Sequence, residues 1–157
     1  MAKPLIVTNG DEAVARLRAA EIEGDYIPWR DVLHEGPVPS GLMLEALSLV
    51  RAQFLSREYG RPLTDVGRQF TERNIAVRNH MQYQRVELWF EHDLYDQLQL
   101  IELLDFFASD DRLDGLWLVQ ASDHLGTLPA PALPRPGRWP PSRRSLRYRH
   151  FSCRAPM

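Results

Sequence analysis

The stretch Leu5-Ile6-Val7-Thr8-Asn9-Gly10-Asp11 decides the fold class of this 157-residue chain. Three apolar residues in succession are typical of a strand that is buried on both faces, as in a parallel sheet. Asn9 or Asp11 is a suitable N-cap for the helix that follows, in which apolar residues repeat at helical spacing until Gly24. A buried strand followed directly by a helix predicts an α/β fold.

Outward from this stretch, Tyr26-Ile27-Pro28-Trp29 predicts a second strand. Pro28 lacks an N–H donor, so this strand is expected at an edge of the sheet. Residues 42–59 and about 64–80 each carry an apolar stripe at helical spacing. Two successive helices interrupt the alternation of strand and helix, and we interpret them as an inserted helical hairpin that covers one face of the sheet.

The strand–helix pattern then resumes. Residues 85–90 predict a third strand, residues 94–108 a strongly apolar helix, and residues 115–120 a last strand. The inward side of the apolar helix is expected to include Leu94 and Ile101. The predicted fold is a small three-layer α/β sandwich with about four mostly parallel strands and a helical-hairpin insertion.

Charge is unevenly distributed along the chain. Residues 1–128 contain twelve basic and twenty-one acidic residues, whereas residues 129–157 contain seven arginines, no acid and seven of the twelve prolines. We interpret 1–128 as a single α/β domain and 129–157 as a Pro/Arg-rich tail. The tail is either a disordered basic arm or the product of a shifted reading frame. An acidic body gives no strong case for nucleic-acid binding.

Cysteine usage and hydropathy favour a cytoplasmic location. Cys153 is the one cysteine, which excludes a disulfide framework and a cysteine-based metal site. No apolar run approaches the roughly 18 residues that cross a bilayer, and the first residues lack the layout of a signal peptide. We expect no membrane partner, and the sequence does not indicate an oligomeric state.

Polar side chains gather where the predicted strands end, which is where open parallel sheets bind ligands. The four ends offer Asn9-Gly10-Asp11; Arg30, Asp31, His34 and Glu35; Glu91, His92, Asp93 and Asp96; and Ser122-Asp123-His124. The catalytic candidates are His34, His92, Glu91 and Asp31, with acid–base roles for the imidazoles because they titrate near neutral pH. The candidate ligand contacts are Asn9, Asp11, Arg30 and Trp29, the last by stacking.

Ordinary helix capping explains part of this pattern. Asp93 is a natural N-cap, and Asp96 three residues later suits the helix dipole. Asp11 and the next acid repel a phosphate, and there is no GxGxxG or P-loop, so a ribose hydroxyl or a metal fits that turn better. His92 with Asp93 and Asp96 offers ligands for a divalent metal, but the two-histidine spacing of HExxH is absent. Metal and cofactor are therefore left open.

Three segments, taken in order, resemble a bacterial family named domain of unknown function 1835. They are Val7-Thr8-Asn9-Gly10-Asp11, Trp29-Arg30-Asp31-Val32-Leu33-His34-Glu35-Gly36-Pro37-Val38 and Leu88-Trp89-Phe90-Glu91-His92-Asp93-Leu94-Tyr95-Asp96-Gln97-Leu98. The resemblance covers roughly residues 4–120 and implies that the three segments belong to one domain. It carries no activity and no catalytic residue. The Pro/Arg-rich tail departs from it, in line with a damaged or misread C-terminus.

The sequence leaves two function classes open. In the first, the chain is an enzyme or a ligand-binding domain for a nucleotide-like or phosphorylated small molecule, held in a polar cleft at the carboxyl ends of the strands. In the second, it is a non-catalytic regulatory or protein-interaction module, in which the same polar residues are helix caps and ion pairs that fix the loops.

Overall fold

The computed structural model describes residues 3–110 and 114–120 of the chain. Its strands are β1 (Leu5–Asn9), β2 (Asp25–Trp29), β3 (Val86–Phe90) and β4 (Leu116–Gln120). Its helices are α1 (Gly10–Ala19), α2 (Leu44–Tyr59), α3 (Leu63–Arg78), the short 3₁₀ helix η1 (Asn79–Gln82) and α4 (Leu94–Ser109). The tail 129–157, with Cys153, and the segment Ser122-Asp123-His124 lie outside the described residues.

The four strands form one parallel sheet in the order β2-β1-β3-β4. Val7 of β1 is paired with Ile27 on one side and Leu88 on the other. β2 lies at an edge, as Pro28 predicts, since a proline there removes no hydrogen bond from a strand beyond it. The chain runs from β1 outward to β2 and then returns to β3, so the strand order reverses between β1 and β3. That reversal defines the switch point of the sheet.

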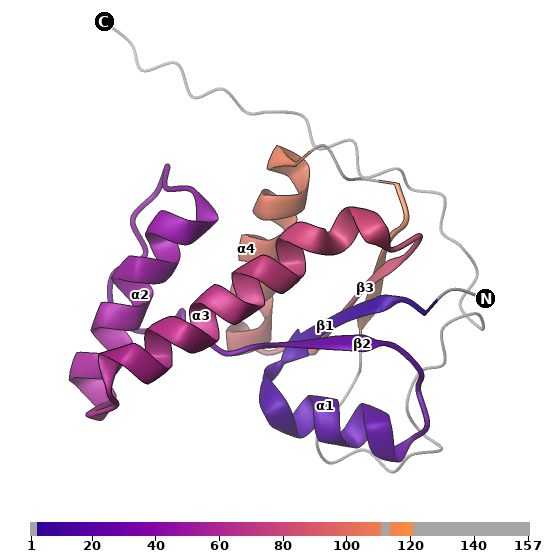
Figure 1. Ribbon diagram of the computed structural model, residues 1–157, viewed down its shortest axis with the longest axis horizontal. Coiled ribbons are helices and arrows are strands. Elements are labelled where there is room, and N and C mark those ends of the chain that lie inside the picture. The colour runs from indigo at the N-terminus through magenta and orange to yellow at the C-terminus, as the bar shows by residue number, and fades with distance from the viewer. Residues whose placement is uncertain (1–2, 111–113, 121–157) are drawn as a thin grey trace, which may run out of the picture.

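Helices cover the sheet on two sides, which confirms the three-layer α/β architecture (Figure 1). Successive residues of each strand contact the helices on opposite sides of the sheet, because side chains on a strand point alternately to its two faces. Ile6 packs with Leu17 of α1 in one buried cluster. Val7 and Leu88 belong to a second cluster that includes Leu103 of α4.

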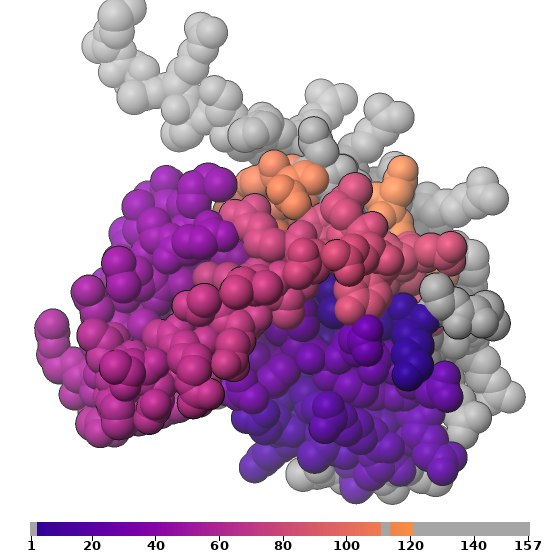
Figure 2. Space-filling model, viewed as in Figure 1, coloured from indigo at the N-terminus to yellow at the C-terminus, as the bar shows by residue number. Residues whose placement is uncertain are grey.

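The expected helical-hairpin insertion is the antiparallel pair α2–α3, which lies between β2 and β3 in the chain. Gly60 ends α2 in the left-handed conformation, with φ of 64°, and Pro62 is the N-cap of α3. A third apolar cluster of Ala52, Leu55, Val66 and Phe70 joins the two helices. In the space-filling view of Figure 2, α3 lies across the front with α2 beside it, so one side of the hairpin faces solvent.

Two details differ from the prediction. Leu94 and Ile101 of α4 are each 62% exposed, and the buried face instead consists of Asp96, Gln99, Leu100, Leu103, Phe106 and Phe107. Apolar residues surround most of α4, so periodicity could not decide which side meets the sheet. α1 ends at Ala19, five residues before Gly24. Within the described part of the chain, no helix has both the length and the apolar character needed to cross a membrane.

Candidate functional site

At the switch point, hydrogen bonds between side chains join the end of β1 to α4. The Asn9 side-chain amide donates to the Asp96 carboxylate and accepts from Gln99 at 3.1 Å. The second carboxylate oxygen of Asp96 accepts from the backbone N–H of Glu91 at 2.6 Å. Asp96 is 1% exposed, and burial raises the pKa of its carboxyl group. Asn9 therefore makes contacts within the protein at the position where the sequence predicts a ligand contact.

Arg51, in the middle of α2, organises the segment 31–37, here called the 31–37 loop. Its Nε and Nη2 atoms lie 3.0 and 2.9 Å from Oδ1 of Asp31, and neither side chain is exposed. The same guanidinium donates to three carbonyl oxygens of the loop, those of Val32 at 2.8 Å, Glu35 at 2.7 Å and Pro37 at 3.1 Å. A charged group with four acceptors in one loop fixes the path of that loop. Asp31, predicted as catalytic, is thus a buried anchor.

Arg73 and Glu102 place a second pair of opposite charges in the interior. The Arg73 guanidinium lies 3.8 Å from the ring centre of Trp29 and 4.0 Å from that of Phe70. Its Nη2 atom is 3.8 Å from Oε1 of Glu102, whose other oxygen accepts from the Trp29 indole at 2.8 Å. Burial lowers the pKa of Arg73 and raises that of Glu102.

Trp29 is fully buried, with 0% exposure. The expectation that it stacks on a ligand is therefore wrong for this structure. The indole ring instead makes a cation–π contact with the Arg73 guanidinium. A tryptophan that precedes a polar loop in the sequence is compatible with either role.

Arg30 and Asp11, at the carboxyl ends of β2 and β1, form an ion pair that solvent can reach. Two hydrogen bonds of 2.7 and 2.6 Å join the guanidinium to both carboxylate oxygens. The side chains are 36% and 67% exposed. The hydrogen bond from Arg30 lowers the pKa of Asp11. These two predicted ligand contacts are thus adjacent and reachable from solvent, and together they carry no net charge.

His34 lies against the N-terminal turn of α4. Its ring centre is 4.3 Å from that of Tyr95, in an edge-to-face arrangement of 79°. Its Nε2 atom is 3.4 Å from Oε1 of Glu35, and the second oxygen of Glu35 accepts from the Tyr59 hydroxyl at 2.6 Å. The side chains of His34 and Tyr95 keep 25% and 52% exposure, respectively. The 31–37 loop, which follows β2, thereby brings an imidazole to α4, the helix that follows β3 on the other side of β1.

The segment after β3 combines a cap with exposed polar groups. Asp93 is the N-cap of α4 and accepts from the backbone N–H of Asp96 at 2.9 Å, as predicted. His92 is exposed. Among residues 3–110 and 114–120, no group of three or more His, Cys, Asp or Glu side chains is arranged to hold a metal ion. Within the described residues, no such group supports the hypothesis that His92, Asp93 and Asp96 bind a metal ion.

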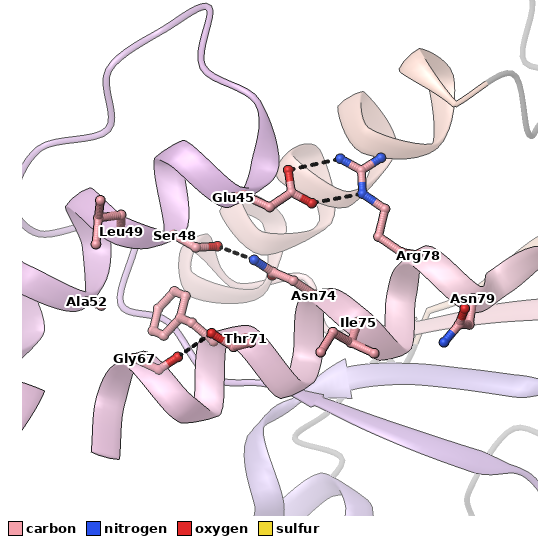
Figure 3. A pocket seen from close by; sticks show the side chains of 11 residues that line it. Glu45, Ser48, Leu49, Ala52, Gly67, Thr71, Asn74, Ile75, Arg78 and Asn79 are labelled. Carbon is pink, nitrogen blue, oxygen red and sulfur yellow. Dashed lines mark hydrogen bonds and ion pairs between the residues drawn. The ribbon is translucent and has the colours of Figure 1, made fainter. Parts of the chain in front are cut away.

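A groove of about 530 Å³ lies elsewhere, between α2 and α3, and none of the residues predicted for the site lines it (Figure 3). The carboxyl ends of the strands are bordered instead by the 31–37 loop and by the first turns of α1 and α4. We define the edge surface as Asp11, Arg30, His34 and Tyr95.

The sequence did not predict a role in this region for four residues: Arg51, Arg73, Gln99 and Tyr95. A signal for the arginines exists, because each stands at an inward position of an apolar helical stripe. Arg51 is four residues from both Leu47 and Leu55. A charge at such a position requires a buried partner. The helical spacing therefore shows that a partner exists, although it does not identify Asp31.

Comparisons with known proteins give no relative: no protein-family model, no curated protein and no solved structure matches the chain.

Proposed function

We propose that the chain is a ligand-binding domain, and that its edge surface contacts a nucleotide-like small molecule. One observation carries the proposal: Arg51 of the inserted hairpin fixes the 31–37 loop through a fully buried ion pair, and the loop holds His34 against Tyr95. The surface lies at the carboxyl ends of β1, β2 and β3, beside the switch point, where sheets of this type bind ligands.

The energetics support a role in positioning. A buried ion pair has a large desolvation penalty, and well-packed apolar residues in its place are often equally stable or more so. In the described interior, Oδ2 of Asp31, Nη1 of Arg73 and Oε1 of Gln99 also have no hydrogen-bond partner. Each such atom costs about 1–3 kcal/mol. The Asp31–Arg51 pair, together with Gln99, which donates to the Asp31 carbonyl oxygen at 2.9 Å, gives the loop a defined geometry. A fixed loop lowers the entropy lost when a ligand binds.

The edge surface suits a base and a ribose. The His34 and Tyr95 rings provide partly exposed aromatic groups for a planar base. The Asp11 carboxylate can accept hydrogen bonds from sugar hydroxyls, and Arg30 remains as a donor for a phosphate. If the domain is catalytic, His34 is the acid–base candidate of this surface, with Glu35 beside it at 3.4 Å.

Thermal-shift measurements test the proposal. The full chain is screened with adenosine, guanosine, AMP, GMP, ribose 5-phosphate, Mg²⁺ and Zn²⁺. A ligand at about 100 times its Kd stabilises the folded chain by about 2.7 kcal/mol, which raises Tm by several degrees. We expect a nucleoside or nucleotide to give this shift, and His34→Ala and Tyr95→Ala to remove it. Gln84→Ala, in an exposed position before β3, serves as the control that keeps the shift.

Three further predictions from the sequence, about His92 and Glu91, the cellular location and the family resemblance, are part of this proposal. We propose that His92 and Glu91 adjoin the bound molecule, since they directly follow β3. A cytoplasmic location fits the single cysteine. We propose, as the resemblance to the domain of unknown function 1835 family implies, that the three motif segments, which include Asp11, Arg30, His34 and Tyr95, belong to one domain; the resemblance adds no activity.

A further inference from the structure

Two buried side chains of opposite charge face each other across a gap where the α2–α3 hairpin meets α4. The Nη2 atom of Arg73 is 3.8 Å from Oε1 of Glu102, which is beyond hydrogen-bond distance, although the two side chains are only 3% and 10% exposed. The other oxygen of Glu102 accepts from the Trp29 indole at 2.8 Å. A buried polar contact longer than about 3.5 Å is compatible with a bridging water molecule.

Several buried atoms near this gap have no hydrogen-bond partner among the described residues. Oε1 of Glu102 and Nη1 of the Arg73 guanidinium are two of them, and Oε1 of Gln99 and Oδ2 of Asp31 are two more. Gln99 stands three residues before Glu102, so both lie on one side of α4, and Gln99 donates to the carbonyl oxygen of Asp31 at 2.9 Å. Asp31 lies close enough for its charge to act on both Arg73 and Glu102. One unpartnered donor and three unpartnered acceptors therefore belong to one buried cluster.

The composition of this cluster selects the kind of molecule that fits it. An anion is disfavoured, because three of the four unpartnered atoms are oxygens that accept hydrogen bonds. A cation is disfavoured, because the positive charges of Arg51 and Arg73 both act on Glu102. A water molecule is neutral, and it has O–H donors for the oxygens and lone pairs for the Arg73 nitrogen. Buried waters typically make about three such hydrogen bonds to otherwise unpartnered polar groups.

We propose that this cluster is a binding site for an internal water molecule, which bridges Nη1 of Arg73 and Oε1 of Glu102. Each hydrogen bond of such a bridge spans about 2.5–3.2 Å, so one molecule can reach both side chains across the gap. The bridge joins α3 of the inserted hairpin to α4. It also offsets part of the cost of burying polar atoms that have no partner within the chain. The inference is independent of the proposed ligand.

The chain provides a matched control on the opposite face of the sheet. Trp89 is as fully buried as Trp29, and its indole donates to Glu87 at the same distance of 2.8 Å. The second oxygen of Glu87, however, lies 2.7 Å from Nε of Arg85, so this close ion pair leaves no gap for a water molecule between the two charges. Of the two indoles, that of Trp29 alone is therefore expected beside a bound water.

Water-selective NMR of the ¹⁵N-labelled full chain, with the indole N–H signals assigned, tests the inference. A rotating-frame Overhauser peak between water and an indole N–H reports a bound water nearby, and its sign separates it from hydrogen exchange. We expect this peak for Trp29 and none for Trp89. A high-resolution crystal structure of the full chain should also show a water oxygen about 2.5–3.2 Å from both Nη1 of Arg73 and Oε1 of Glu102.

Each other outcome overturns the inference. The absence of a water peak at Trp29, or equal peaks at Trp29 and Trp89, shows that the gap binds no water of its own. A crystal structure in which Arg73 donates directly to Glu102 shows that the two charges need no bridge. An ion bound between them shows that the cluster selects a charged species instead of water.

Discussion

Asp31 and Arg51 form an ion pair of 2.9 Å in which neither side chain is exposed. The pair joins the loop after an edge strand to the middle of a helix that starts thirteen residues later. Because the same guanidinium also binds three loop carbonyls, the conformation of the 31–37 loop depends on the position of α2. The inserted hairpin therefore determines where His34 lies.

Arg51→Met should destabilise the fold strongly. The substitution leaves the Asp31 carboxylate buried without its partner, which typically costs about 3–5 kcal/mol. Urea unfolding measures the change in free energy. Arg68→Met is the control, because Arg68 pairs with Glu72 on the exposed side of α3 and such pairs contribute about 0–1 kcal/mol. Similar losses in the two variants would contradict the role assigned to Arg51.

Gly36 and Gly41 form a matched pair in the connection between β2 and α2. Both have positive φ, of 74° and 77°, which alanine adopts at a cost of about 1–2 kcal/mol. A Cβ atom at Gly36 would also lie 2.5 Å from the Phe54 ring, whereas at Gly41 it meets nothing within 4 Å. We expect Gly36→Ala to lose at least about 1 kcal/mol more than Gly41→Ala. Equal losses in chemical denaturation would show that Phe54 does not confine the loop.

Glu102 gives the fold a pH dependence. Burial raises its pKa above the ordinary 4.5, so between 4.5 and the raised value the folded chain binds a proton that the unfolded chain has released. The free energy of unfolding therefore falls as the pH rises through this window. Glu102→Gln should make the fall shallower in urea unfolding from about pH 4 to about pH 8. The exposed Glu72→Gln should keep the original slope, and an unchanged slope in Glu102→Gln would count against this assignment.

Asp93 caps α4 and thereby fixes the turn that carries Tyr95. Asp93→Ala removes the acceptor for the backbone N–H of Asp96, and losing such a cap costs about 1 kcal/mol. Thermal unfolding should show this loss. Asp105→Ala, in an exposed position inside the same helix, should change the stability by less than about 0.5 kcal/mol. A larger loss at Asp105 than at Asp93 would be incompatible with the cap.

Local sequence patterns explain how much of the fold could be predicted. The apolar run at β1, the proline in β2 and the helical stripe of α2 each depend on neighbouring residues, and each prediction is confirmed. The face of α4 could not be predicted, because Leu94 and Leu100 are equally apolar and only the packed sheet distinguishes them. The spacing of apolar residues identifies a helix, but it does not identify the buried side when apolar residues lie all around that helix.

The candidate site was predictable only as a set of segments. Arg30 and Asp11 follow neighbouring strands, so their closeness follows from the parallel sheet. The partner of Asp31 lies twenty residues away in a different helix, and no local pattern specifies that pairing. Trp29 illustrates the same limit, since its burial depends on Arg73 from the inserted hairpin.

We propose above all that the edge surface binds a nucleotide-like ligand. The most direct test is a two-dimensional ¹H–¹⁵N NMR titration of the full chain with adenosine and AMP, up to about 5 mM. We expect saturable chemical-shift changes confined to residues 9–11, 30–37 and 91–96. Unchanged spectra with both compounds, or changes centred on the groove between α2 and α3, would contradict it.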